Sequence, residues 1–201
     1  MTGELSFLPI HAAGRYLGSD LVCLSDYCVS SYIPTLSALT KSRSCWQPIA
    51  RTHVTSLLVC EESPHVGGGP GGVLVEAANE VRLVRECFQY AQAQVLNAPS
   101  MHTSLSQLRT LLEDTPPHIL HLACHGVQDS DPLKSALLLQ DGKLAIEDIM
   151  SFDLPDAVLA FLSACQTAKG DRNAPDQSIH LAASMLFCGF RSVIGTMWCV
   201  Y

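Results

Sequence analysis

Short apolar runs rich in Val, Ile and Leu alternate with amphipathic stretches from residue 54 onward. Such runs are typical of strands buried on both faces, and the stretches between them are typical of crossover helices. The pattern predicts an α/β fold with a mostly parallel central sheet. The predicted strands are Val54–Cys60, Gln94–Leu96, Ile119–Ala123, Val158–Ala164 and Arg191–Thr196, and the predicted helices are Val75–Tyr90, Ser104–Leu112 and Ile179–Cys188.

A further short apolar run lies between the third and fourth predicted strands. Ala136–Gln140 is followed by Asp141-Gly142 and then by Lys143–Ile146. An Asp-Gly pair between two apolar runs is typical of a tight hairpin turn. We therefore expect an inserted hairpin in which Gly142 supplies a positive φ angle.

The first fifty residues have a less regular pattern. Leu5–Ile10 and Tyr27–Ile33 are candidate strands, and Pro34 ahead of Leu36–Leu39 is typical of a helix start. We interpret residues 1–51 as an N-terminal extension of a domain that spans residues 52–201. A chain of 201 residues fits one such domain.

Residues 61–72, EESPHVGGGPGG, contain five of the thirteen glycines and no apolar period. A phosphate-binding loop is one interpretation, but the Lys-Ser/Thr of a P-loop and the GxGxxG spacing are both missing. The proline also removes one backbone N–H donor. We expect a mobile loop.

The composition excludes several function classes. With 48% hydrophobic and 15% charged residues, the chain is not intrinsically disordered. Its net charge of −7 argues against nucleic acid or an anionic membrane as the main partner. We see no secretion signal and no stretch of about 20 apolar residues that would span a membrane.

The nine cysteines are irregularly spaced and form no CxxC pair, so we expect reduced thiols, a cytoplasmic protein, and no metal or other cofactor. Most of them should be inert core residues. These are Cys23, Cys28, Cys45, Cys60, Cys87, Cys188 and Cys199.

Two predicted strands end in residues that can carry chemistry. Ile119–Ala123 leads into Cys124-His125-Gly126, and Val158–Ala164 leads into Cys165. The carboxyl ends of parallel strands share one edge of a sheet, where ligands bind. His125 could then act as base for a Cys165 nucleophile, and the N–H groups of Gly126 and Cys165 could hold an oxyanion.

Two alternatives involve the residues around His125. Cys124 is a rival thiol, but side chains alternate along a strand, so it should point away from His121 and His125 into the core. His121-x-x-Cys124-His125 also resembles a crowded metal site, yet the same alternation separates those ligands. We expect His121 to be a buried, hydrogen-bonded histidine.

The motifs HLACHG at 121–126, ALLLQDG at 136–142 and LSACQTAKG at 162–170, with the stretch from Pro175 to Trp198, occur in a fixed order. Together they resemble the CHAT domain, a caspase-like family related to separase and often attached to tetratricopeptide repeats. The resemblance implies a caspase-like three-layer α/β fold, with the family's histidine at His125 and its cysteine at Cys165. Because the family usually continues beyond the tryptophan, we expect this chain to be C-terminally truncated.

The leading hypothesis is a cysteine endopeptidase that cleaves protein substrates with a His125/Cys165 dyad. The alternative is a catalytically inactive regulatory or interaction module, with a repeat domain or other regulatory partner performing recognition. Asp129 follows His125 along the chain and Asp176 follows Cys165, so both could lie near the candidate cleft. Helix capping is the first interpretation for Asp176 and a solvated loop position for Asp129, while a substrate pocket is the other interpretation for both.

Overall fold

The computed structural model describes residues 8–17, 22–44, 54–62, 73–90, 94–95, 103–127, 129–163 and 181–196. Its centre is a five-stranded sheet in the order β10-β9-β5-β3-β4, in which every neighbouring pair is parallel. This confirms the predicted parallel sheet. The strands are β3 (Thr55–Cys60), β4 (Gln94–Val95), β5 (Ile119–Ala123), β9 (Leu159–Ser163) and β10 (Ser192–Gly195).

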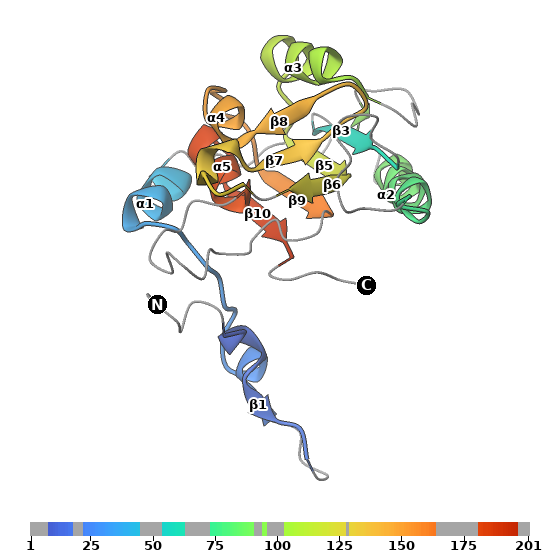
Figure 1. Cartoon of the computed structure of the whole chain (residues 1–201). Coiled ribbons are helices and arrows are strands. Elements are labelled where there is room, and N and C mark those ends of the chain that lie inside the picture. Colours follow the sequence, from blue (N-terminus) through green and yellow to red (C-terminus); the bar gives the residue numbers. More distant parts are fainter. Residues whose placement is uncertain are drawn as a thin grey trace.

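Helices cover both faces of this sheet and create a three-layer domain (Figure 1). On one face, α2 packs its apolar side against β3 and β5. On the other face, α3, α4 and α5 enclose the larger core. The arrangement is consistent with a caspase-like three-layer fold. The helices are α1 (Leu36–Ser44), α2 (Ala77–Tyr90), α3 (Leu105–Asp114), α4 (Ile146–Ile149) and α5 (Leu181–Cys188).

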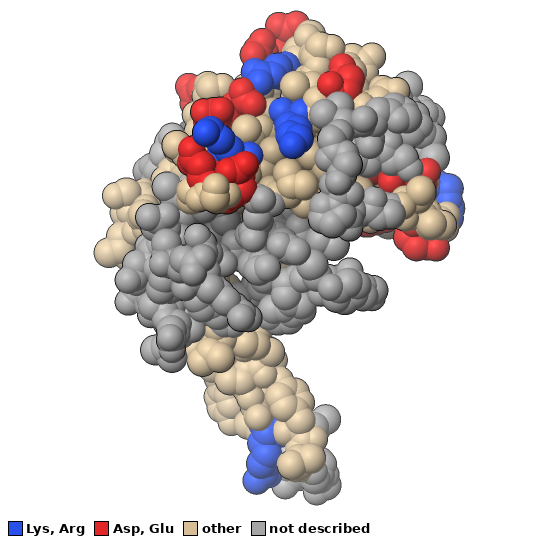
Figure 2. Space-filling model, viewed as in Figure 1, with Lys and Arg blue, Asp and Glu red and all other residues tan. Residues whose placement is uncertain are grey.

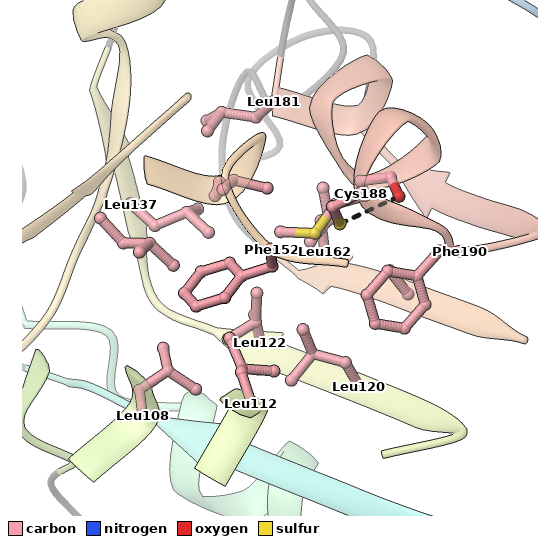
Figure 3. Packing of buried hydrophobic residues seen from close by; sticks show 14 of the residues in the cluster. Leu108, Leu112, Leu120, Leu122, Leu137, Phe152, Leu162, Leu181, Cys188 and Phe190 are labelled. Carbon is pink, nitrogen blue, oxygen red and sulfur yellow. Dashed lines mark hydrogen bonds between the residues drawn. The ribbon is translucent and has the colours of Figure 1, made fainter. Parts of the chain in front are cut away.

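The larger core is built mainly from leucines (Figure 3). Leu120 and Leu122 point from β5 into this cluster, where they meet Leu108 of α3 and Phe152. Burying one such side chain fully stabilises the fold by about 1.5–3 kcal/mol. The α5 segment LAASMLFC is apolar around its whole circumference, which is typical of a helix enclosed on several sides.

The predicted hairpin is present, but its turn differs from the prediction. β7 (Ala136–Leu138) and β8 (Lys143–Ala145) pair antiparallel, and β6 (His125–Val127) adds a third strand to this small sheet. Gly142 has no positive φ angle; among the described glycines only Gly189 has one. Gly142 instead permits close packing, because a Cβ there would lie 2.8 Å from Cδ2 of Leu105.

The N-terminal segment differs more from its prediction. Tyr27–Ile33 contains no strand, and Ile10, expected at the end of a strand, begins the 3-10 helix Ile10–Ala12. In the described part of this segment, the strands are the short pair β1 (Gly14–Arg15) and β2 (Val22–Cys23), and a second 3-10 helix, Leu24–Asp26, follows. The helix expected after Pro34 is confirmed as α1. Figure 1 shows the segment around β1 extending away from the sheet.

Acidic and basic side chains are mixed on the face seen in Figure 2. Lys and Arg atoms lie beside Asp and Glu atoms over the α3 and α4 side of the domain. Arg109 of α3 forms an ion pair with Asp148 of α4 at 2.5 Å. Lys134, at the end of the 3-10 helix Pro132–Lys134, forms an ion pair with Asp131 at 3.6 Å. The net negative charge therefore does not make the described part of this face uniformly acidic.

Candidate functional site

His125 lies just beyond the carboxyl end of β5. Ala123 is the last residue of that strand, Cys124 follows, and His125 begins β6 opposite Leu138 of β7. The histidine is half-buried. The chain therefore leaves the central sheet at Cys124, and His125 stands where β5 passes into the small antiparallel sheet.

The strand that leads to Cys165 is the direct neighbour of β5. In the parallel register of β5 and β9, Ala123 is opposite Ser163. His125 follows Ala123 by two residues, and Cys165 follows Ser163 by two residues. Cys165 itself, Asp176 and the glycine-rich stretch 63–72 lie outside the described residues, so their predicted roles stay predictions.

Cys124, the rival thiol, is fully buried in the larger core. Burial is the largest of the effects that raise the pKa of its thiol to about 12. Such a group is almost entirely protonated at neutral pH and reacts poorly as a nucleophile. This confirms that Cys124 is a core residue on the face opposite His121.

The other cysteines divide into two groups. Cys60 and Cys188 are buried, as predicted, and burial raises the pKa of Cys60 to about 11. Cys28 and Cys87 are exposed and Cys23 is half-buried, so the prediction of a core position was wrong for these three. Cys87 occupies the solvent side of amphipathic α2, where the helical period could have shown its exposure. Cys45 and Cys199 lie outside the described residues.

A polar cluster connects α2 to the middle of β5 and to the end of β9. Glu80 of α2 accepts a hydrogen bond at Oε2 from Oγ of Ser163, at 2.7 Å. Its other oxygen, Oε1, lies 3.2 Å from Nε2 of His121 on β5. Glu80 is not among the residues predicted from the sequence. The feature of the sequence that could have indicated this residue is its place on α2 beside the apolar positions Ala77, Val81 and Val84, which face the sheet.

His121 is buried, as predicted, and its ring stacks on Phe161 of β9 with centroids 5.1 Å apart. Its contact with Glu80 has the distance of an ion pair but not the alignment of a hydrogen bond, which corrects the prediction of a hydrogen-bonded side chain. Burial lowers the pKa of His121, and the nearby Glu80 carboxylate opposes that shift. The imidazole is therefore neutral at pH 7.

The remaining predicted residues near His125 have local contacts. Asp129 is exposed, and its carboxylate accepts hydrogen bonds from the Asp131 N–H at 3.0 Å and the Ser130 hydroxyl at 3.3 Å. The bond from Asp131 is the main reason that the pKa of Asp129 is lowered. Gly126 pairs with Leu137 in the β6–β7 register. Asp129 thus stabilises the turn after β6.

The histidine and cysteine of the 121–125 segment do not converge as metal ligands. His121 contacts α2 on one face of the sheet, whereas Cys124 is enclosed by the core on the other. Within the described ranges, no three His, Cys, Asp or Glu side chains lie close enough together to hold a metal ion.

The sheet order, the helices on both faces and the His125 position can be compared with known families. A family model described as the CHAT domain matches residues 1–201. The chain belongs to the CHAT domain family. No curated protein compared with the chain matches it. The match includes residues 1–51 as well as the segment that carries the CHAT-like motifs. In the part of this CHAT domain that is described, no helix is long and apolar enough to cross a membrane.

Proposed function

We propose that this CHAT domain is a cysteine endopeptidase in which Cys165 is the nucleophile and His125 is its base. The observation that carries the proposal is the parallel register of β5 and β9, in which Ala123 and Ser163 are paired. Neighbouring strands lie about 4.8 Å apart. Residues that follow this pair at equal distances along the chain are thus candidates to meet at one edge of the sheet.

The chemistry follows from the residue types. His125 takes the proton of the Cys165 thiol, and the thiolate attacks the carbonyl carbon of a peptide bond. The N–H groups of Gly126 and Cys165 stabilise the resulting oxyanion. The imidazolium then gives its proton to the leaving amine, which leaves an acyl group on sulfur, and water attacks that thioester to release the acid and restore the thiol.

The other described thiols and contacts support this assignment. Cys124 and Cys60 are buried and have raised pKa values, so neither competes as a nucleophile beside His125.

The compartment and the partners follow from the same proposal. A reducing compartment such as the cytoplasm agrees with the free thiols of Cys23, Cys28, Cys60, Cys87 and Cys124. Substrates would be proteins or peptides, and a repeat domain or other regulatory partner would present them.

The test is covalent labelling with an electrophilic peptide probe. The chain would carry Cys28→Ser and Cys87→Ser, because these two thiols are exposed and would react non-specifically. We expect one adduct at Cys165 by mass spectrometry, no adduct in Cys165→Ala, and at least a hundredfold slower labelling in His125→Ala, in line with the usual contribution of a general base, about 10²–10⁴-fold.

A matched control is His11→Ala, since His11 lies in the N-terminal segment and its ring contacts Tyr32. This variant should label at the wild-type rate. Labelling at Cys165 that is no faster than at an ordinary exposed thiol, and unchanged in His125→Ala, would contradict the proposal. That result would instead support an inactive caspase-like interaction module.

A further inference from the structure

We propose that Glu80 is a positioning residue for the Cys165 nucleophile, because it anchors the end of the strand that leads to Cys165 to helix α2. The inference rests on the proposed peptidase function and adds a residue to it. Glu80 would not touch the substrate. It would act through Ser163, two residues before the nucleophile in the sequence.

The contacts place Glu80 at the junction of three elements. Its Oε2 accepts a 2.7 Å hydrogen bond from Ser163 at the end of β9, and its Oε1 lies 3.2 Å from His121 on β5. These are the two strands that lead to Cys165 and His125. One carboxylate therefore bonds to the end of β9 and contacts β5 from the same helix, close to the edge where the dyad would form.

The helix provides a firm support for this carboxylate. Ala77 and Val81, one turn before and one residue after Glu80, are buried against Leu58 and Cys60 of β3. The Glu80 side chain is 35% exposed, so its contacts are partly shielded from water and stronger than those of a surface pair. A displacement of α2 or of Glu80 would thus be transmitted to the end of β9.

A carboxylate suits this position because one oxygen accepts the hydrogen bond from Ser163 while the other brings negative charge next to His121. Glutamine at the same place would still offer one oxygen to Ser163 but would lose the negative charge next to His121. Alanine would remove both contacts. Nucleophile and base must be held closely, since a displacement of about 1 Å can reduce a rate by about a hundredfold.

The test measures how fast iodoacetamide alkylates Cys165 across pH, again with Cys28→Ser and Cys87→Ser. We compare Glu80→Ala, Glu80→Gln and Ser163→Ala with the parent chain. The control is Glu86→Gln on the same helix, where the side chain is 57% exposed and pairs only with Arg82 among its described contacts. Thermal unfolding is recorded for every variant, so that rates are compared on folded protein.

We expect Glu80→Ala and Ser163→Ala to react about tenfold more slowly than the parent at pH 6 and equally fast at pH 9.5. A looser dyad stabilises the thiolate less, and this matters only where the thiol is otherwise protonated. Glu80→Gln should recover part of the rate, because it keeps an acceptor for Ser163. Glu86→Gln should match the parent. A purely structural role would not move this pH profile.

The outcomes separate the two proposals. If the parent chain reacts at Cys165 no faster than an ordinary thiol and His125→Ala changes nothing, the peptidase function fails. If the parent shows the enhanced reaction but Ser163→Ala and Glu80→Gln keep its pH profile, the role of Glu80 is refuted. The same holds if Glu86→Gln produces an equal loss. Should Glu80→Ala not fold, Ser163→Ala and Glu80→Gln still decide the question.

Discussion

Gly189 provides a sharp test of the packing between the end of α5 and the segment around Leu154 that precedes β9. The residue follows the last residue of α5 and has a φ angle of +130°. A Cβ at this position would lie 2.3 Å from the carbonyl oxygen of Leu154 and 2.7 Å from its carbonyl carbon. Ordinary contacts of a Cβ are 3.4 Å or longer. Gly189→Ala would therefore force the two backbones apart by about 1 Å. The same two backbones are joined by a 2.8 Å hydrogen bond from the Leu154 N–H to the Cys188 carbonyl oxygen, which this displacement would stretch.

Two costs add at this position. Placing a side chain at a φ angle that favours glycine costs about 1–3 kcal/mol, and inserting a methyl group into a filled core costs about 1–3 kcal/mol more. We expect Gly189→Ala to lower the free energy of unfolding by about 4 kcal/mol. Urea titrations followed by circular dichroism, with the m-value checked for constancy, would measure this change.

The matched control for this substitution is Gly142→Ala. Gly142 has no positive φ angle, and its added Cβ would meet the flexible end of Leu105 at 2.8 Å. A rotation of that side chain relieves the contact, so the loss should stay below about 1.5 kcal/mol. The reasoning is refuted if Gly189→Ala is destabilised by less than about 1 kcal/mol, or if Gly142→Ala loses as much stability as Gly189→Ala.

Two further predictions concern titratable groups. In the folded chain at pH 7.5, iodoacetamide should label Cys28 and Cys87 rapidly and spare Cys60 and Cys124, because pKa values of about 11 and about 12 leave roughly three thiolates in ten thousand and three in a hundred thousand, respectively. Mass spectrometry before and after unfolding in urea would show this, and rapid labelling of Cys124 in the native state would contradict its burial. Stability should also fall as the pH drops below about 6.5, since the lowered pKa of His121 means that the unfolded chain takes up the proton first. The contribution of His121 to this loss is at most about 1.4 kcal/mol per pH unit. His121→Gln should therefore lose less stability than the parent between pH 7.5 and pH 5. An equal loss would show that other groups cause the acid sensitivity.

The central sheet could be predicted because its strands bury both faces. Val54–Cys60 and Ile119–Ala123 are mostly apolar runs, and the strands observed there, β3 and β5, span nearly the same residues as predicted. Burial on both faces leaves no room for a polar residue that would need a partner. Among the polar positions of this sheet, His121 and Ser163 are informative, because both contact Glu80.

Short and exposed elements could not be predicted in the same way. The four-residue helix α4 is too short to show a helical period, although Asp148 accepts a hydrogen bond from the Ala145 N–H at its start. Tyr27–Ile33 has the composition of a strand but its side chains lie exposed or nearly so. Among the described residues no strand pairs with this stretch, and β propensity alone does not create a strand.

The candidate site depends on strand order, which the local sequence pattern does not contain. Along the chain the strands run β3, β4, β5, β9, but in space β3 lies between β4 and β5, and β9 continues on the β5 side. The chain thus reverses direction across the sheet after β4, so that β5 pairs with β3. Had β5 been added beyond β4 instead, β3 and α2 would have been separated from it, and Glu80 could not contact His121 and Ser163. The reversal therefore places β5, the strand that leads to His125, beside β3 and within reach of α2, and so creates the contacts by which Glu80 would hold the end of β9.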